Sequence, residues 1–155
     1  MAEPEDEEQS AVPLDDVDRR IIAELTRDGR MSVTHVAENV HISRAHAYTR
    51  IARLTGQGVL TKFTALVDPI KAGLKSSAYV TLKVRQHSWR ELRELLRAIP
   101  EVHHIALVGG DFDVILLVRA SDARDLRRIV LEDIQAIPSI RSTRTTLIFE
   151  DFTLI

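Results

Sequence analysis

The chain has 155 residues, no cysteine, 45% apolar residues and a formal net charge of −2. This composition excludes disulfides and thiolate metal sites, and it leaves room for one domain or two small ones with real cores. No apolar run approaches the roughly 20 residues of a membrane span, and the acidic start is unlike a secretory signal, so we expect a cytoplasmic protein.

The charge is unevenly distributed along the chain. Five acidic residues fall within the first ten positions, in a segment with almost no large apolar side chain. Such a segment buries too little apolar surface to offset its ordering entropy, so residues 1–13 are predicted to form a disordered acidic tail. Residues 41–62 contain no acidic residue and four basic ones. This stretch suits contact with phosphates, although a solvated helix face would show the same charges.

Residues 14–60 carry the patterns of three helices. The first has one apolar stripe of helical period, made of Leu14, Val17, Ile21, Ile22 and Leu25. It is predicted to begin at Asp15 or Asp16 and to end near Gly29. Ser32 is the expected N-cap of a short second helix, and Ser43 that of a third.

The third helix has two different faces. Its predicted buried positions are Ala47, Ile51 and Leu54. The other face carries Arg44, His46, Thr49, Arg50 and Arg53. Two short helices joined by about three residues, the second of them basic, are typical of a helix-turn-helix that reads DNA. An ordinary three-helix bundle also fits this pattern.

The next segment is predicted to be extended. Residues 59–69, VLTKFTALVDP, are rich in aliphatic, aromatic and Thr residues and favour a wing or a linker strand. The Gly and Ser residues of IKAGLKSS mark a boundary near residue 70. We therefore assign residues 61–76 to a linker strand and hinge.

Residues 77–155 contain a weak internal repeat. Strand, helix and strand patterns occur twice, and both helices end in Ala-Ile-Pro shortly before the next strand. Two such units in tandem predict a ferredoxin-like βαββαβ domain, and the chain as a whole is of the α+β class. Right-handed crossovers place both helices on one face of the sheet.

The strand VILLV indicates that the second face is also covered. Val114, Leu116 and Val118 alternate with Ile115 and Leu117, so both of its faces are apolar. Because no further element is available in the chain, we expect a second copy to cover this face, which predicts a homodimer packed sheet on sheet.

The stretch HHIALVGGDFDVILLV gathers His, Gly and Asp residues inside an apolar run. Consecutive strand residues point to opposite faces, so His103 and His104 are not expected to bind one ion together. Asp111 and Asp113 lack a clear third ligand, and we expect neither a metal nor a cofactor.

The same stretch does not support an enzymatic function. The signature Gly-Gly-Asp-Glu-Phe of cyclic-dinucleotide synthases requires a glutamate where this chain has Phe112, and a domain about twice as long. No nucleophile and base stand at a recognisable spacing, so we do not expect an enzyme.

Two interpretations of the glycine pair remain open. Gly109, Gly110 and Asp111 suit a tight β-hairpin, which accounts for the motif structurally. Glycines also leave backbone N–H groups accessible to a carboxylate, and a nearby aspartate can hold an ammonium group. Such a loop would suit an α-amino acid.

Several segments in order resemble the Lrp/AsnC (feast/famine) transcription regulators. These segments are LDDVDRRIIAELTRDGRMS, VAENVHIS, RIARL, GVL and GDFDVILLVRA, and together they run from about Leu14 to Phe152. The resemblance implies a winged helix-turn-helix domain, residues 14–60, and a ferredoxin-like effector and oligomerisation domain, residues 77–155. It also implies dimers that assemble further, often to octamers, and an amino acid bound between dimers.

The resemblance assigns two sets of site residues. The residues that would face double-stranded DNA are Ser43, Arg44, His46, Thr49, Arg50 and Arg53. The residues that would bind the effector are Val108, Gly109, Gly110, Asp111 and Asp113, with Thr143 and Thr145 on the last strand.

Two positions depart from the family pattern. His41 stands where Gly is usual in the turn, and His tolerates positive φ. Thr55 stands where glutamate is usual.

The sequence as a whole predicts a sequence-specific DNA-binding regulator controlled by a small effector. The alternative is a small-molecule sensor or assembly module whose helix-turn-helix serves protein contacts.

Overall fold

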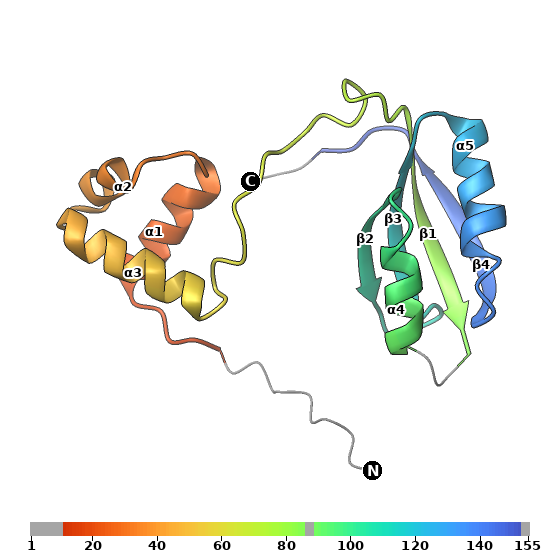
Figure 1. Cartoon of the computed structure of the whole chain (residues 1–155), viewed down its shortest axis with the longest axis horizontal. Helices are drawn as coiled ribbons and strands as arrows, with labels where there is room; N and C mark the ends of the chain where they lie inside the picture. The colour runs from red at the N-terminus through yellow and green to blue at the C-terminus, as the bar shows by residue number, and fades with distance from the viewer. Residues whose placement is uncertain (1–10, 86–88, 153–155) are drawn as a thin grey trace, which may run out of the picture. The chain divides into compact units, whose positions relative to one another are not determined.

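The computed structural model of the chain describes residues 11–85 and 89–152. These residues form two compact units, and the chain passes from the first to the second between Leu66 and Val67 (Figure 1). Most of the predicted acidic tail, residues 1–10, lies outside the described residues. None of the described helices is long and apolar enough to cross a membrane.

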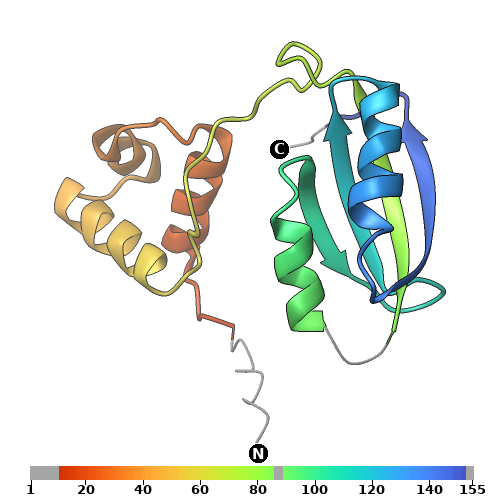
Figure 2. The same ribbon diagram turned by 45° about the vertical axis from the view of Figure 1, so that its right-hand side comes forward.

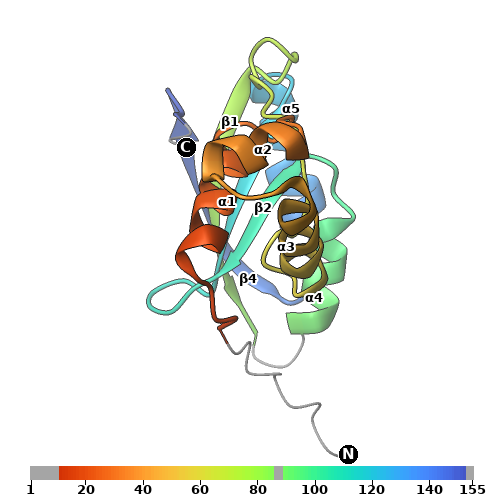
Figure 3. The ribbon, with the colours of Figure 1, turned by 90° about the vertical axis from the view of Figure 1, so that its left-hand side faces the viewer.

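The described part of the N-terminal unit contains three helices, which Figure 3 shows packed together. They are α1 (Asp16–Arg27), α2 (Val33–Val40) and α3 (Arg44–Gly56). Each begins at a predicted cap, because the side chains of Asp15, Ser32 and Ser43 accept a hydrogen bond from a backbone N–H three residues later. Capping satisfies N–H groups that have no partner inside the helix, so these residues fix where each helix starts.

One apolar core holds the three helices together. Its buried side chains are Ile21, Leu25, Val36, Val40 and Leu54, with Ala47 also fully buried. The apolar stripe predicted for α1 is confirmed, although Leu14, Val17 and Ile22 are only partly buried. The third predicted inward position of α3, Ile51, also packs partly buried against this core.

The turn between α2 and α3 depends on a left-handed residue. His41 has φ 60° and ψ 49°, and it is the only described non-glycine residue with positive φ. Its N–H donates to the carbonyls of Ala37 and Glu38, which ends α2 and turns the chain toward α3. The prediction that His41 takes the place of a turn glycine is confirmed.

The strand predicted over residues 59–69 does not form within the single chain. After α3 the described backbone runs without regular structure to the turn at residues 69–73. Phe63, Leu66, Val67 and Ile70 are exposed. A strand requires a hydrogen-bonded neighbour, and this segment has none in the described chain, so its β-favouring composition alone does not order it.

The C-terminal unit is a four-stranded antiparallel sheet with helices on one face (Figure 2). Its elements are β1 (Ser76–Val84), α4 (Trp89–Arg97), β2 (Val102–Leu107), β3 (Val114–Ala120), α5 (Ala123–Arg128), the π-helix η1 (Ile129–Ile134) and β4 (Ile140–Ile148). The strand order β2-β3-β1-β4 is that of the ferredoxin-like fold, so the predicted α+β architecture is confirmed.

The two faces of this sheet differ in burial. Val114, Leu116 and Val118 of β3 are completely buried under α4, α5 and η1. Ile115 and Leu117, on the opposite face, are half-buried, and Tyr79 beside them on β1 is exposed. No helix or strand in the described part of this unit covers that second face, which we call the open face. The alternation predicted for β3 is therefore confirmed.

Candidate nucleic-acid interface and effector loop

The start of α3 presents an exposed polar surface. Arg44, His46, Tyr48 and Thr49 are all exposed. Among the described residues, Arg44 has no ion-pair partner. Thr49 donates its hydroxyl hydrogen to the carbonyl oxygen of Ala45 at 3.0 Å. This end of α3 offers a cation, a ring nitrogen and helix-terminal N–H groups to a ligand, a combination suited to duplex DNA.

Arg50 and Arg53 have a different environment from Arg44. Arg50 Nη1 lies 2.8 Å from Asp18 Oδ1, and Arg53 Nη2 lies 2.6 Å from Asp18 Oδ2. Both arginines are therefore bound internally to α1. Because both guanidinium groups attach α3 to α1, they have a structural role in addition to any contact with DNA phosphates.

Asp18 is the buried charge at the centre of this network, which we call the Asp18 cluster. Its side chain is only 2% exposed. Burial by itself raises the pKa of Asp18, but the hydrogen bonds from Arg53, from Arg50 and from the backbone N–H of Asp15 outweigh it and lower the pKa to about 2. A buried carboxylate between two guanidinium groups stays ionised and holds both in place.

Asp15 is the second carboxylate bound to Arg50. Its Oδ2 lies 2.7 Å from Arg50 Nη1, while its Oδ1 caps α1 by accepting from the Asp18 N–H at 2.8 Å. The N–H of Asp18 and the guanidinium of Arg50 hold the pKa of Asp15 below its usual value. A surface hollow between the start of α1 and α3 is lined by Pro13, Leu14, Asp15, Asp18, His46, Thr49, Arg50 and Arg53.

The loop between β2 and β3 is closed by Asp113. The Val108 N–H donates to the Asp113 carbonyl at 3.0 Å. The Asp113 carboxylate accepts from the Val84 N–H at 2.8 Å and pairs with Lys83 Nζ at 3.2 Å. These two donors hold the pKa of Asp113 below its usual value. Asp113 thus anchors the loop to the end of β1, a structural role that the sequence did not reveal.

The tip of the loop is open to ligands. Gly109, Gly110 and Asp111 are exposed, and Gly110 has φ 117°, a conformation that favours glycine. Among the described residues, the backbone N–H groups of 109–112 donate to no protein acceptor. The loop ends on Phe112, whose ring lies 5.3 Å from the guanidinium carbon of Arg144 on β4. This contact fixes one side of the loop over β4.

The two threonines lie away from the loop carboxylates. Thr143 and Thr145 are paired with Leu82 and Val80, whose side chains are buried under the helices. Lys83, which binds Asp113, follows Leu82 on β1 and so lies on the open face. Thr143 Oγ1 accepts instead from Gln135 Nε2 at 2.6 Å. Within one chain, the structure groups residues 108–113 and leaves the threonines on the other face.

A β-bulge in β2 interrupts the regular alternation of side chains that was assumed for His103 and His104. Val102 is opposite Val118 and His104 is opposite Leu117, so His103 is an extra residue in β2. Both histidines are exposed, and strict alternation does not separate them. Partial desolvation of the imidazole and the Arg119 guanidinium lower the pKa of His103. Among the described residues, no three His, Asp or Glu side chains are grouped to hold a metal ion.

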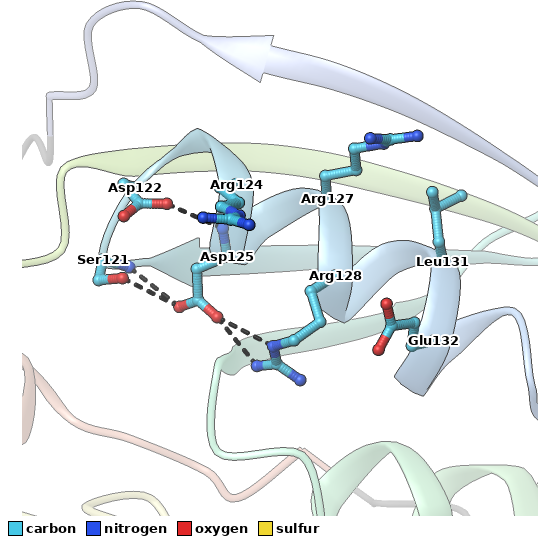
Figure 4. A pocket seen from close by; sticks show the side chains of 8 residues that line it. All are labelled: Ser121, Asp122, Arg124, Asp125, Arg127, Arg128, Leu131 and Glu132. Carbon is cyan, nitrogen blue, oxygen red and sulfur yellow. Dashed lines mark hydrogen bonds and ion pairs between the residues drawn. The ribbon is translucent and has the colours of Figure 1, made fainter.

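A second hollow lies along α5 and η1, and Figure 4 shows its lining. Asp125 accepts hydrogen bonds from the backbone N–H and the hydroxyl of Ser121 and pairs with Arg128 at 2.9 Å. Arg128 also pairs with Asp133 at 2.7 Å. Asp125 is thus already bound by Ser121 and Arg128, which leaves its carboxylate less available to the ammonium group of a ligand.

Family comparisons agree with this division of the chain. The model for the AsnC-type helix-turn-helix domain matches residues 14–55, and that for the Lrp/AsnC ligand-binding domain matches residues 77–153. The chain belongs to the Lrp/AsnC family. This Lrp/AsnC protein is therefore a transcriptional regulator with a helix-turn-helix and a ligand-binding domain.

Relatives of this regulator are similar over nearly the whole chain. The proline dehydrogenase transcriptional activator of Rhizobium radiobacter is 34% identical over 88% of this chain and 90% of its own. The leucine response regulatory protein LrpA of Mycobacterium tuberculosis is 31% identical, with a TM-score of 0.80 over 91% of this chain and 96% of its own. A Neisseria meningitidis regulator in complex with L-Met shares the fold, with a TM-score of 0.82, 21% identity and coverage of 92% and 94%.

The Asp18 cluster yields a stability prediction. Asp18→Asn removes the charge shared by Arg50 and Arg53 and should destabilise the N-terminal unit by about 3–5 kcal/mol. Since folding lowers the pKa of Asp18 from 3.8 to about 2, its stabilising effect is complete above roughly pH 4 and is lost as the pH falls toward 2.

Denaturant unfolding followed by circular dichroism at several pH values measures this effect. The difference between the wild type and Asp18→Asn should shrink between pH 4 and pH 2. Asp16→Asn, at a carboxylate that is 97% exposed, is the control and should change little. A wild-type advantage that stays constant over this range would contradict the role given to Asp18.

Proposed function

We propose that this regulator binds a defined duplex DNA site through α3 and that an α-amino acid at the loop 108–113 controls the binding. The observation that carries the DNA-binding proposal is the exposed start of α3. There Arg44 and His46 form no ion pair with any residue that the structure describes, and they lie next to the cap at Ser43. Side chains at the start of a recognition helix are those that reach base edges in the major groove.

The arginines of α3 have two separate roles in this proposal. Arg44 and His46 contact base edges, and Thr49 lies beside them. Arg50 and Arg53 first position α3 through the Asp18 cluster, and they reach phosphates from that fixed position. Loss of either arginine would thus disturb the orientation of the helix as well as a phosphate contact.

An α-amino acid fits the chemistry of the loop. The N–H groups around Gly109 and Gly110, which have no acceptor within residues 11–85 and 89–152, suit its carboxylate, and the exposed carboxylate of Asp111 suits its ammonium group. Asp113 holds the loop in shape, because its own oxygens are already bound to Val84 and Lys83. The names of the relatives, which concern proline dehydrogenase, leucine response and L-Met, support this class of effector.

We also propose a homodimer formed through the open face, which assembles further to an octamer. The centre of this face is apolar, with Ile115, Leu117 and Tyr79 partly or largely exposed in the single chain. Burial against a second copy would remove that surface from water. Thr143 and Thr145 lie on the other face, so they would approach an effector only from a neighbouring subunit.

The DNA-binding role predicts a specific effect of Arg44. Arg44→Ala should weaken binding to DNA from upstream of the protein's own gene by about 1–3 kcal/mol, the usual cost of losing a base contact. Fluorescence anisotropy measures the affinity. Arg127→Ala removes a charge that is also exposed, from the C-terminal unit, and should leave the affinity nearly unchanged. Equal loss in both variants would show that only the net charge matters.

The effector site predicts stabilisation by one or a few amino acids. A ligand at about 100 times its Kd stabilises the folded state by about 2.7 kcal/mol, so a thermal-shift screen of amino acids should find it. Asp111→Asn should abolish this shift but keep basal DNA binding. Glu132→Gln, another exposed carboxylate of the same unit, should respond like the wild type. If Asp111→Asn responds fully, the ligand binds elsewhere.

The open face predicts the state of association. Light scattering at micromolar concentration should show a dimer or a larger assembly. Leu117→Lys places a charge on the open face and should shift the chain toward monomers. Leu147→Lys, at an exposed position on the other face of β4, is the matched control and should still dimerise. A wild-type chain that remains a monomer would rule out this arrangement.

A further inference from the structure

One nitrogen of Arg50 is shared by two carboxylates of very different exposure. Arg50 Nη1 lies 2.7 Å from Asp15 Oδ2 and 2.8 Å from Asp18 Oδ1. The Asp18 side chain is 2% exposed, whereas that of Asp15 is 54% exposed and that of Arg50 is 30% exposed. Arg50 is therefore held from behind by a buried partner and covered on its outer side by a solvent-accessible one.

The outer partner lies on the surface assigned to DNA. Asp15 lines the same hollow as His46, Thr49 and Arg50 of α3. Its carboxylate occupies an Arg50 donor that a DNA phosphate would otherwise use, and phosphate and carboxylate bind guanidinium in the same way.

The two ion pairs differ in how easily they open. An exposed pair contributes little net stability, because water and salt compete with it. Breaking a buried pair is costly, because it leaves a charge without a partner. Arg50 can therefore release Asp15 and keep Asp18, so a phosphate can replace Asp15 while the buried pair still holds Arg50.

We propose that Asp15 is an internal competitor of DNA, which occupies Arg50 in the free protein and lowers the affinity of the regulator for DNA. This inference rests on the proposed function, namely that α3 binds DNA. Asp15 is also the N-cap of α1, and asparagine caps a helix as well as aspartate does. Asp15→Asn thus removes the competing charge but keeps the cap.

The experiment compares Asp15→Asn with Asp16→Asn in the full chain. Both variants lose one negative charge, but Asp16 is 97% exposed and pairs only with Arg19 of its own helix, at 3.4 Å. Anisotropy titrations use DNA from upstream of the protein's own gene, at several salt concentrations. Thermal unfolding of each variant tests whether the fold is kept.

At low salt, Asp15→Asn should bind DNA about threefold to fivefold more tightly for each DNA-binding domain. This factor corresponds to the free energy that an exposed ion pair contributes. The slope of log K against log salt should stay close to that of the wild type, because Arg50 contacts a phosphate in both complexes. Asp16→Asn should change the affinity much less. In an Arg50→Ala background, Asp15→Asn and Asp16→Asn should behave alike.

The outcomes separate the inference from the function on which it rests. If the wild type binds no DNA, the proposed function fails and the competitor role fails with it. If the wild type binds DNA but Asp15→Asn binds no more tightly than Asp16→Asn, the competitor role is wrong and the DNA-binding function stands. An advantage of Asp15→Asn that persists without Arg50 would also overturn the competitor role.

Discussion

The buried carboxylate of Asp18 is the constraint on which the reading surface depends. It lies on α1 but binds Arg50 and Arg53 of α3, so it fixes how the third helix lies against the first. A helix that reads base edges must hold its side chains in a defined position, and a buried charge pair gives more directional attachment than apolar contacts alone. The exposed start of α3 thus projects from a helix whose middle is fixed.

Asp113 has a comparable role in the C-terminal unit. It binds the backbone of Val84 and the side chain of Lys83, while Phe112 contacts Arg144 on the other side of β1. The loop is thereby attached to two strands, although its tip at Gly110 stays exposed. A site with a fixed base and accessible backbone N–H groups is prepared for a small anionic group without large rearrangement.

The sequence predicted the elements better than the contacts between them. Helix caps and alternating strands are local patterns, so Ser32, Ser43 and the faces of β3 could be read directly. The Asp18 cluster joins segments about thirty residues apart in the chain, so no local pattern predicts it. The equal spacing of Asp15 and Asp18 on one helix and of Arg50 and Arg53 on another was the signal in the sequence that could have indicated these ion pairs. The bulge at His103 and the unformed strand at residues 59–69 depend on strand partners that composition does not specify.

The DNA-binding helix α3 and the effector site proposed at the loop 108–113 form one regulator only if the two sites are coupled. The direct test is isothermal titration of the amino acid found by thermal shift, with and without DNA, together with DNA titrations with and without that amino acid. Coupling between two sites is reciprocal, so both comparisons should give the same factor, typically about 5- to 150-fold. Binding of both ligands with no change in either affinity would contradict this account.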